Sequence, residues 1–403
     1  MKKYIFLLLL WVLTLPVSAQ TDSLTAQQDT VPALPWPQSL QANIDTLLTD
    51  HPLFDISQVG FMIYDLTADS VLYQYNHRHT LRPASNMKLV TAIAALDRLG
   101  DKHQLRTSLY YTGVRDSCTL RGDLYCVGGM DPLFDADDLE AFVEGVRRLG
   151  IDTIRGRIVA DKTMKDADLL GWGWCWDDDN PVLSPLLIGR KDNFTERFAQ
   201  ALRKAGMTVD VQLSEGRLPA GATYMVACVH NIGNVLPKMM KDSDNLYAES
   251  LFYQLAATSG ARPASAKHAR QVITKLIEKL GLPSSAYHIA DGSGLSLYNY
   301  LSPELEVALL RYAWSKESIR KPLYVSLPIA GRDGTLSKRM KRTVAEGNVH
   351  AKTGTLKGVT TLAGYCTAAN GHMLCFAIMN QGVLKTSNGR DFQDRLCILM
   401  CQP

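Results

Sequence analysis

The sequence has little net charge and no long apolar run beyond its N-terminal segment. Both features exclude classes of protein. Its 403 residues carry a formal charge of +3, which becomes +1 without Lys2 and Lys3 of the N-terminal segment. This balance gives no sign of a nucleic acid or an acidic polymer as a partner. Beyond the N-terminal segment no apolar stretch reaches membrane length, so we expect no transmembrane segment in the mature chain.

Signals for metal binding and lipid attachment are also missing. No Cys/His spacing is typical of a zinc site, and we expect neither a metal nor an organic cofactor. The N-terminal apolar run is not followed by a cysteine, which argues against a lipoprotein. Residues 1–19 instead combine two lysines, an apolar core and the small-residue end Val17-Ser18-Ala19. This pattern predicts a signal peptide and a periplasmic protein, with a flexible linker over the polar, proline-containing residues 20–38.

Three short motifs occur in a meaningful order: Ser85-Asn86-Met87-Lys88, Ser243-Asp244-Asn245 and Lys352-Thr353-Gly354. Each motif alone is weak, because a serine three residues before a lysine arises by chance several times in a chain of this length. All three in this order form the Ser-x-x-Lys, Ser-x-Asn, Lys-Thr-Gly signature of enzymes with a serine nucleophile. They are therefore the candidate catalytic and binding residues.

The first motif has a physical rationale of its own. Ser85 precedes a run that is apolar nearly all round up to Gly100, which predicts a buried helix opened by Ser85. The helix N-terminus favours a developing oxyanion. Lys88 lies one turn further on and could accept the hydroxyl proton if burial and neighbouring positive charge lower its pKa. The alternative is an N-cap serine beside a lysine whose head reaches solvent.

The second and third motifs supply the remaining parts of such a site. Ser243 is a candidate proton relay to the leaving amine, and Asn245 could hydrogen-bond the substrate or hold Lys88. The alternative is an ordinary helix cap.

Residues 349–356 resemble an edge strand, along which Gly354 leaves room for a peptide, while Lys352 and Thr353 could bind a terminal carboxylate. The Thr355 amide would complete an oxyanion hole with that of Ser85. The alternative is a strand end with a solvated lysine.

The resemblance extends beyond the three motifs. Five stretches, residues 82–92, 122–132, 291–296, 327–336 and 351–356, are similar to the D-alanyl-D-alanine carboxypeptidase/endopeptidase family of the penicillin-binding protein 4 type (low-molecular-mass class C). This resemblance implies cleavage of the D-Ala-D-Ala bond of peptidoglycan stem peptides, and often of cross-links, through an acyl-serine intermediate. It makes Ser85 the nucleophile and Lys88 the base, with Ser243, Asn245, Lys352 and Thr353 completing the site. We assign no catalytic role to residues 291–294, because they also describe a tight turn.

The expected fold is α/β, a serine β-lactamase/DD-transpeptidase-like antiparallel sheet flanked by helices and interrupted by one inserted domain. β-rich runs at 56–64, 71–75, 359–366 and 373–380 predict a sheet assembled from both ends of the chain, and 264–280 predicts a covering helix. We place the DD-peptidase domain at 39–104 and 186–403 and the insert at 105–185. A second insert that is usual in this family looks deleted.

Several residues outside the motifs leave alternatives open. If Asn370-Gly371 forms a two-residue turn, Cys366 would face Cys375 and a disulfide is conceivable; Cys118 and Cys126 could pair across a hairpin. Cys397 and Cys401 look like helix-core residues. Trp172, Trp174 and Trp176 precede acidic residues 177–179, which favours aromatic anchoring of the insert over a wall- or calcium-binding loop. Asp131 could meet an amino group of the substrate, although a turn is favoured.

The sequence therefore predicts a periplasmic serine-type D-Ala-D-Ala carboxypeptidase, with DD-endopeptidase activity as an open addition. Its expected partners are stem peptides ending in D-Ala-D-Ala, with β-lactams as covalent inhibitors. One alternative is a serine β-lactamase, which needs a deacylating water that no motif here activates. Another is a non-catalytic wall-binding or scaffold protein, which would be expected to have lost at least one motif residue.

Overall fold

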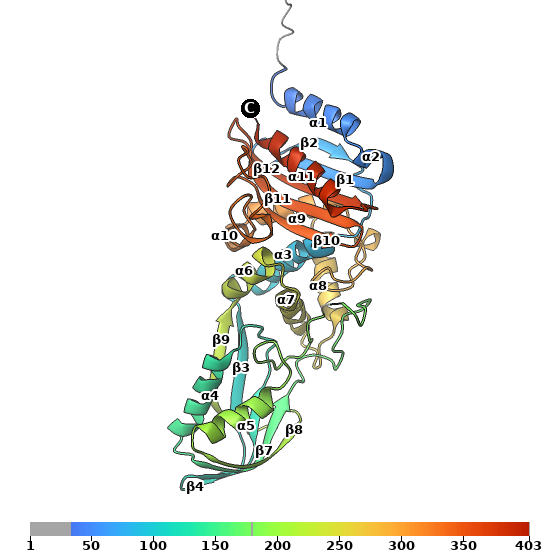
Figure 1. The fold of residues 1–403 in the computed structure, drawn as a ribbon. Coiled ribbons are helices and arrows are strands. Elements are labelled where there is room, and N and C mark those ends of the chain that lie inside the picture. Colours follow the sequence, from blue (N-terminus) through green and yellow to red (C-terminus); the bar gives the residue numbers. More distant parts are fainter. Residues whose placement is uncertain (1–33, 179, 403) are drawn as a thin grey trace, which may run out of the picture.

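The chain folds around two β-sheets that lie at opposite ends of an elongated molecule (Figure 1). The computed structural model describes residues 34–178 and 180–402, so the predicted signal peptide and most of the predicted linker lie outside the described residues. The N-terminal and C-terminal segments, blue and red in Figure 1, build the first sheet together. The second sheet comes from the middle of the sequence.

The first sheet is antiparallel and has the strand order β10-β11-β12-β1-β2. The prediction that both ends of the chain form one sheet is confirmed. β11 and β12 are buried along almost their whole length because helices cover both faces. β10 lies at the edge of the sheet, as expected for residues 349–356. The strands are β1 (Gln58–Asp65), β2 (Ser70–Tyr75), β10 (His350–Leu356), β11 (Val359–Thr367) and β12 (Met373–Gln381).

Helices pack on the two faces of this sheet and form two separate apolar cores. On one face Ile44 of α1 and Phe392 of α11 pack with Phe61 of β1. On the other face α9 packs against β12, α3 packs against α9 and α7, and α6, α7 and α8 extend toward the second sheet (Figure 1). The helices are α1 (Gln38–Asp50), α2 (Leu53–Ile56), α3 (Met87–Leu99), α6 (Ile232–Lys241), α7 (Asn245–Ala257), α8 (Ala266–Lys279), α9 (Pro303–Ser315), α10 (Glu317–Ser326) and α11 (Thr386–Cys401). No helix among the described residues has the length and apolar character needed to cross a membrane.

The second sheet has the order β4-β5-β7-β6-β3-β9, and β8 also pairs with β7. Two amphipathic helices pack on it and enclose a third apolar core with Phe142, Phe194 and Phe198. The elements are β3 (Gln104–Tyr111), β4 (Val114–Asp116), β5 (Thr119–Arg121), β6 (Leu124–Val127), α4 (Ala136–Arg148), β7 (Thr153–Asp161), α5 (Phe194–Lys204), β8 (Thr208–Glu215) and β9 (Thr223–Asn231).

The boundary of the insert differs from the one predicted at residue 185. α5, β8 and β9 were assigned to the DD-peptidase domain, but β8 pairs with β7 and β9 pairs with β3 in the second sheet. The unit that contains this sheet therefore runs from Gln104 to Asn231. These two residues face each other in the β3–β9 pair, so the chain enters and leaves the unit at the same place. Sequence periodicity predicts a helix or a strand, but not which of two sheets the strand joins.

The disulfide between Cys366 and Cys375 that the sequence left open does not form, because the hairpin has a different register. Cys366 faces Leu374, while Tyr365 faces Cys375. Ala368 and His372 close a loop of three residues in which Gly371 has φ 86°, a G1-bulge type of turn rather than the two-residue turn expected from Asn-Gly. A shift of one residue turns a side chain to the opposite face, so Cys366 and Cys375 lie in different apolar cores.

Cys118 and Cys126, the other pair left open, are not joined either. β5 and β6 follow one another along the same side of β7, each parallel to it, and do not form a hairpin with each other. All eight cysteines are described, and all are free thiols. Cys397 and Cys401 are buried on α11, which confirms their interpretation as core residues.

Candidate active site

The three motifs meet at the junction of α3, α7 and the edge strand β10. Ser85 lies in a single 3-10 turn, η1 (Ala84–Asn86), directly before α3, and Lys88 lies in the first turn of α3. The Lys88 ammonium Nζ donates to Ser85 Oγ at 3.0 Å and to Asn245 Oδ1 at 2.7 Å. Lys352 Nζ donates to Ser243 Oγ at 2.9 Å. Ser85, Lys88 and Asn245 thus form one hydrogen-bonded group and Lys352 and Ser243 a second, and the second motif contributes a side chain to each.

Lys88 is fully buried, and burial lowers its pKa to about 8. The negative charges of Asp291, Glu249 and Asp244 oppose this shift without cancelling it. The predicted contribution of neighbouring positive charge is not among its causes, so desolvation accounts for the lowered pKa. A lysine with this pKa is neutral in roughly a tenth of molecules at pH 7 and can then accept a proton from Ser85.

Lys352 is also fully buried, and its pKa lies well below the usual value because of burial and the nearby charge of Lys88. Its ammonium donates to Ser243 Oγ and to the carbonyl oxygen of Thr353, at 2.7 Å. Lys352 is not among the residues that line the pocket described below, although its partner Ser243 is. These bonds use two of the three N–H donors of the ammonium, and direct contact of Lys352 with a terminal carboxylate stays a prediction.

The backbone around the nucleophile is strained and closely packed. Ala84 and Ser243 have φ angles of 46° and 60°, in the left-handed region that such residues rarely occupy. A Cβ atom on Gly294 would lie 1.8 Å from the Ala84 carbonyl oxygen. A Cβ atom on Gly354 would lie 3.0 Å from the Ser85 amide nitrogen. Gly354 is thus needed for the approach of β10 to Ser85, a role that the sequence analysis did not predict.

Asn245 is the first residue of α7, and Asp244 fixes the start of that helix. The Asp244 carboxylate accepts hydrogen bonds from the amides of Leu246 and Tyr247, a standard helix N-cap. It also forms an ion pair with Arg190 from the connection between β7 and α5. The capping interpretation of this motif is therefore correct for Asp244, while Ser243 and Asn245 on either side contact the two lysines.

A pocket of about 480 Å3 opens beside the nucleophile. Thr353 Oγ1 donates to Thr335 Oγ1 at 2.7 Å, which joins β10 to the short helix η3 (Gly334–Leu336). Among the described residues, the exposed cations Lys338 and Arg390 have no carboxylate partner. The pocket is lined by Ser85, Ser243, Gly334, Thr335, Ser337, Lys338, Arg339, Thr353, Thr355 and Arg390. The sequence analysis gave 327–336 as a family stretch but assigned no site role to residues 334–339 or to Arg390.

The loop assigned no catalytic role is in contact with the base. The carbonyl oxygen of Ser293 accepts a hydrogen bond from Lys88 Nζ at 2.7 Å, the third acceptor of that ammonium. Glu249 accepts hydrogen bonds from the amides of Gly292 and Ser293, and burial raises its pKa to about 8. The Gly-Ser-Gly turn interpretation was correct for the conformation but missed this contact.

The other residues singled out in the sequence, Asp131 and the described residues 172–178, make no hydrogen bond to a motif side chain. Asp131 is buried and accepts hydrogen bonds from the Leu133 amide and, at 2.7 Å, from His230 Nδ1, as expected of a turn. Trp174 is buried and anchors its loop, whereas Trp172 and Trp176 are exposed. Asp177 and Asp178, which follow, are exposed, and Asp178 accepts a hydrogen bond from the Cys175 amide of its own loop.

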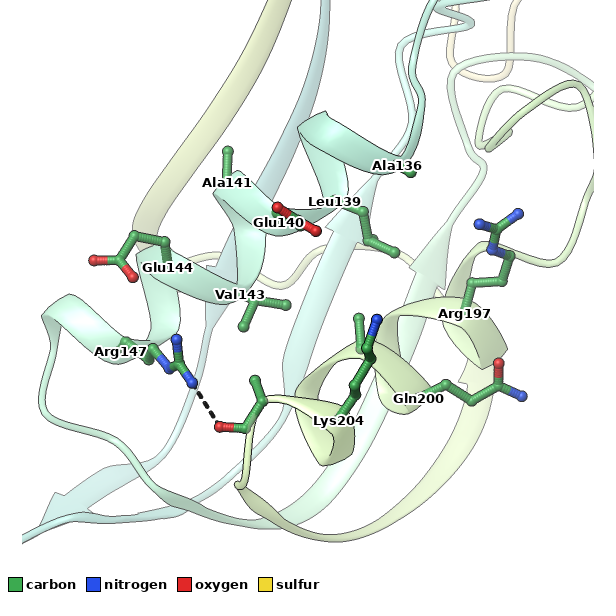
Figure 2. A pocket seen from close by; sticks show the side chains of 12 residues that line it. Ala136, Leu139, Glu140, Ala141, Val143, Glu144, Arg147, Arg197, Gln200 and Lys204 are labelled. Carbon is green, nitrogen blue, oxygen red and sulfur yellow. Dashed lines mark hydrogen bonds between the residues drawn. The ribbon is translucent and has the colours of Figure 1, made fainter.

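A second groove, of about 650 Å3, lies between α4 and α5, the two helices that pack on the second sheet (Figure 2). Leu139 and Val143 form its floor, and Glu140 and Lys204 stand on its opposite walls. It contains no motif residue and no strained backbone position. The smaller pocket beside Ser85 is the candidate active site, because it alone of the two brings a nucleophile and a base together.

A serine held by a buried lysine, beside the edge strand of an antiparallel sheet, defines a serine hydrolase that works through an acyl-enzyme. The chain belongs to the D-Ala-D-Ala carboxypeptidase 3 (S13) family, whose model matches residues 40–186 and 189–402. The family resemblance found in the motifs is thereby confirmed.

Named relatives agree with this assignment. A D-alanyl-D-alanine carboxypeptidase from Actinomadura sp. (strain R39) is 28% identical over 85% of this chain and 81% of its own length. The D-alanyl-D-alanine carboxypeptidase DacB of Haemophilus influenzae is 26% identical over 83% of this chain and 88% of its own length. The crystal structure of penicillin binding protein 4 (dacB) from Haemophilus influenzae superimposes with a TM-score of 0.80 at 25% identity, covering 88% of this chain and 98% of that one. It has also been solved in complex with a β-lactam.

Proposed function

We propose that the protein is a serine-type D-Ala-D-Ala carboxypeptidase that cleaves peptidoglycan stem peptides, with Ser85 as the nucleophile. The observation that carries this proposal is the 3.0 Å hydrogen bond between Ser85 Oγ and the buried Lys88 Nζ. Family membership and the carboxypeptidase names of the relatives support the reaction class. The assignment of individual roles rests on the geometry of this site.

Lys88 acts as the base. Its neutral form accepts the Ser85 hydroxyl proton while the oxygen attacks the carbonyl carbon of the penultimate D-Ala. The amides of Ser85 and Thr355 stabilise the oxyanion that forms. Ser243, held by Lys352, then donates its hydroxyl proton to the departing D-Ala and takes up in return the proton that Lys88 accepted from Ser85. Water hydrolyses the acyl-enzyme and restores Ser85.

The pocket beside Ser85 binds the terminal carboxylate of the substrate. Thr353 and Thr335 provide hydroxyl groups at its wall, and the exposed Arg390 and Lys338 provide positive charge. A guanidinium group suits a carboxylate because its N–H groups match the two oxygens. Lys352 supports this pocket through its hydrogen bond to Ser243. β-Lactams imitate the same substrate end, which agrees with the β-lactam complex of the Haemophilus relative.

The β-lactamase alternative requires a carboxylate free to activate a deacylating water. Glu249, the buried glutamate whose charge acts on Lys88, is engaged by two backbone amides. Glu306, also buried, accepts a hydrogen bond from Asn86. Both arrangements favour slow deacylation. A non-catalytic scaffold is disfavoured because a buried lysine and a strained serine turn are costly to keep without chemistry.

The N-terminal pattern supports a periplasmic location, where the proposed substrate is found. DD-endopeptidase activity would use the same residues on a cross-linked peptide, and the open pocket leaves it as an extension of the proposal.

The test is release of D-Ala from a pentapeptide ending in D-Ala-D-Ala, measured for the wild-type protein and for Ser85→Ala. We expect the variant to lose at least about a thousandfold in rate, because the covalent nucleophile is gone. The two proteins should have the same melting temperature, since the Ser85 side chain is only partly buried. Equal rates would refute Ser85 as the nucleophile. Consumption of penicillin with no D-Ala release would favour the β-lactamase alternative.

A further inference from the structure

The Lys88 base depends on a loop that lies about 200 residues away in the sequence. Residues 291–296 present the Ser293 carbonyl oxygen to Lys88 Nζ. Two buried carboxylates, Glu249 of α7 and Asp291 of the loop itself, accept hydrogen bonds from the loop backbone. Glu249 Oε1 accepts hydrogen bonds from the Gly292 amide at 3.0 Å and the Ser293 amide at 2.7 Å. Asp291 accepts from the amides of Gly294 and Ser296 at 2.8 and 2.7 Å.

Asp291 has two side-chain donors as well. Asn299 Nδ2 donates to Asp291 Oδ1 at 2.8 Å from within the same loop region. Trp174 Nε1 donates to Asp291 Oδ2 at 2.7 Å, and this tryptophan lies on the connection between β7 and α5 of the second sheet. Asp291 is only 1% exposed, so its charge depends on these donors. Trp174 is thus a direct link from the inserted unit to the loop that contacts the base.

Trp174 differs in this respect from its neighbours on the same connection. Its side chain is 9% exposed and belongs to the apolar core that includes α3 and α7. A Cβ atom on Gly171 would lie 2.3 Å from the indole ring, so the loop closes tightly around it. Trp172 is 53% exposed and contacts the rings of His288 and Tyr298. Among the described residues only Trp174 of the three tryptophans donates to Asp291.

We propose that Trp174 is a positioning residue: its hydrogen bond to Asp291 fixes the 291–296 loop and thereby the geometry of Lys88 relative to Ser85. This role rests on the proposed function, since it concerns the base of that reaction. The inserted unit consequently supplies part of the catalytic geometry. Loss of the indole N–H leaves a buried carboxylate with one donor fewer, and the loop can relax away from Lys88.

The charged groups around Lys88 determine how loss of the Trp174 hydrogen bond would shift the pKa of Lys88. Asp291 and Glu249 lie on the loop side, Asp244 lies at the start of α7, and Lys352 lies on β10. If the loop relaxes, the ammonium form of Lys88 loses its Ser293 acceptor, and the carboxylate of Asp291 in the same loop moves away from it. The neutral form then becomes relatively more stable, and the pKa of Lys88 falls.

The test compares Trp174→Phe, which keeps a buried ring but removes the donor, with the matched control Trp172→Phe on the same connection. The rate of acylation by a chromogenic β-lactam is measured from pH 5.5 to 10 for both. We expect about a tenfold lower rate at pH 7 for Trp174→Phe, the size of one hydrogen bond to a charged group. The rising limb of its pH profile should move to lower pH. Trp172→Phe should match the wild type.

A lower melting temperature of Trp174→Phe with an unchanged pH profile would overturn the inference, because it would show a purely structural role. Equal effects of both substitutions would overturn it too. If Trp174→Phe does not fold, Trp174→Tyr serves in its place, since its hydroxyl lies in a different position from the indole nitrogen. Failure of the wild-type protein to be acylated at all would instead count against the proposed function.

Discussion

The lowered pKa of Lys88 predicts a specific pH dependence for acylation. With a pKa of about 8, the neutral fraction of Lys88 is roughly a tenth at pH 7 and roughly nine tenths at pH 9. The acylation rate at low β-lactam concentration should therefore rise about tenfold between these pH values and then level off. A lysine with the ordinary value of 10.5 would give a rise of about a hundredfold over the same interval, with no plateau.

A chromogenic β-lactam measures this rate directly through its ring opening, with stopped-flow mixing and protein in excess. The control is Lys88→Arg, whose guanidinium stays protonated throughout the range and should lose at least about a thousandfold in rate. The melting temperature at each pH shows that the protein remains folded. A rate that climbs tenfold per pH unit up to pH 10 would refute burial as the source of an active base. A rate independent of pH would remove Lys88 from the role altogether.

Three further outcomes follow from the packing around the site. Gly354→Ala would press a methyl group against Thr361 Oγ1, at 2.1 Å, and the Ser85 turn, so acylation should fall about a hundredfold in the same assay; a normal rate would show that β10 need not approach so closely. Arg390→Ala should raise KM for the pentapeptide about tenfold and leave kcat nearly unchanged, and an unaltered KM would exclude Arg390 from carboxylate binding. Alkylation after denaturation without reductant should label Cys366 and Cys375 fully, as judged by peptide mass, and a linked peptide pair would contradict the hairpin register.

The sequence was sufficient to predict the parts of the site that short motifs encode. Ser85 lies in the turn directly before α3 and Lys88 in the first turn of that helix, and Ser243 and Asn245 are two residues apart, so local geometry fixes their relation. The convergence of three distant motifs could be inferred only because the resemblance to a family supplied it. The contact of Ser293 with Lys88 was missed because it depends on Gly294 packing against the Ala84 carbonyl, a relation that no local pattern records.

The register of the β11–β12 hairpin shows a second kind of limit. Both strands are buried on both faces, so their residues do not alternate between apolar and polar. Such strands carry no pattern that distinguishes one register from the next. The Asn370-Gly371 pair then suggested a two-residue turn, whereas Gly371 occupies the left-handed position of a three-residue loop. The sheet to which β8 and β9 belong was hidden for a related reason, since pairing partners are long-range contacts.

The central claim is that Ser85 is acylated, and the intact mass of the protein after incubation with excess penicillin tests it most directly. The account predicts that the wild-type protein gains the mass of one drug molecule, while Ser85→Ala gains none. The remaining drug should be largely unconsumed beyond this single equivalent, because deacylation is slow. An adduct on Ser85→Ala, or no adduct on the wild type at pH 9 where Lys88 is mostly neutral, would contradict the account.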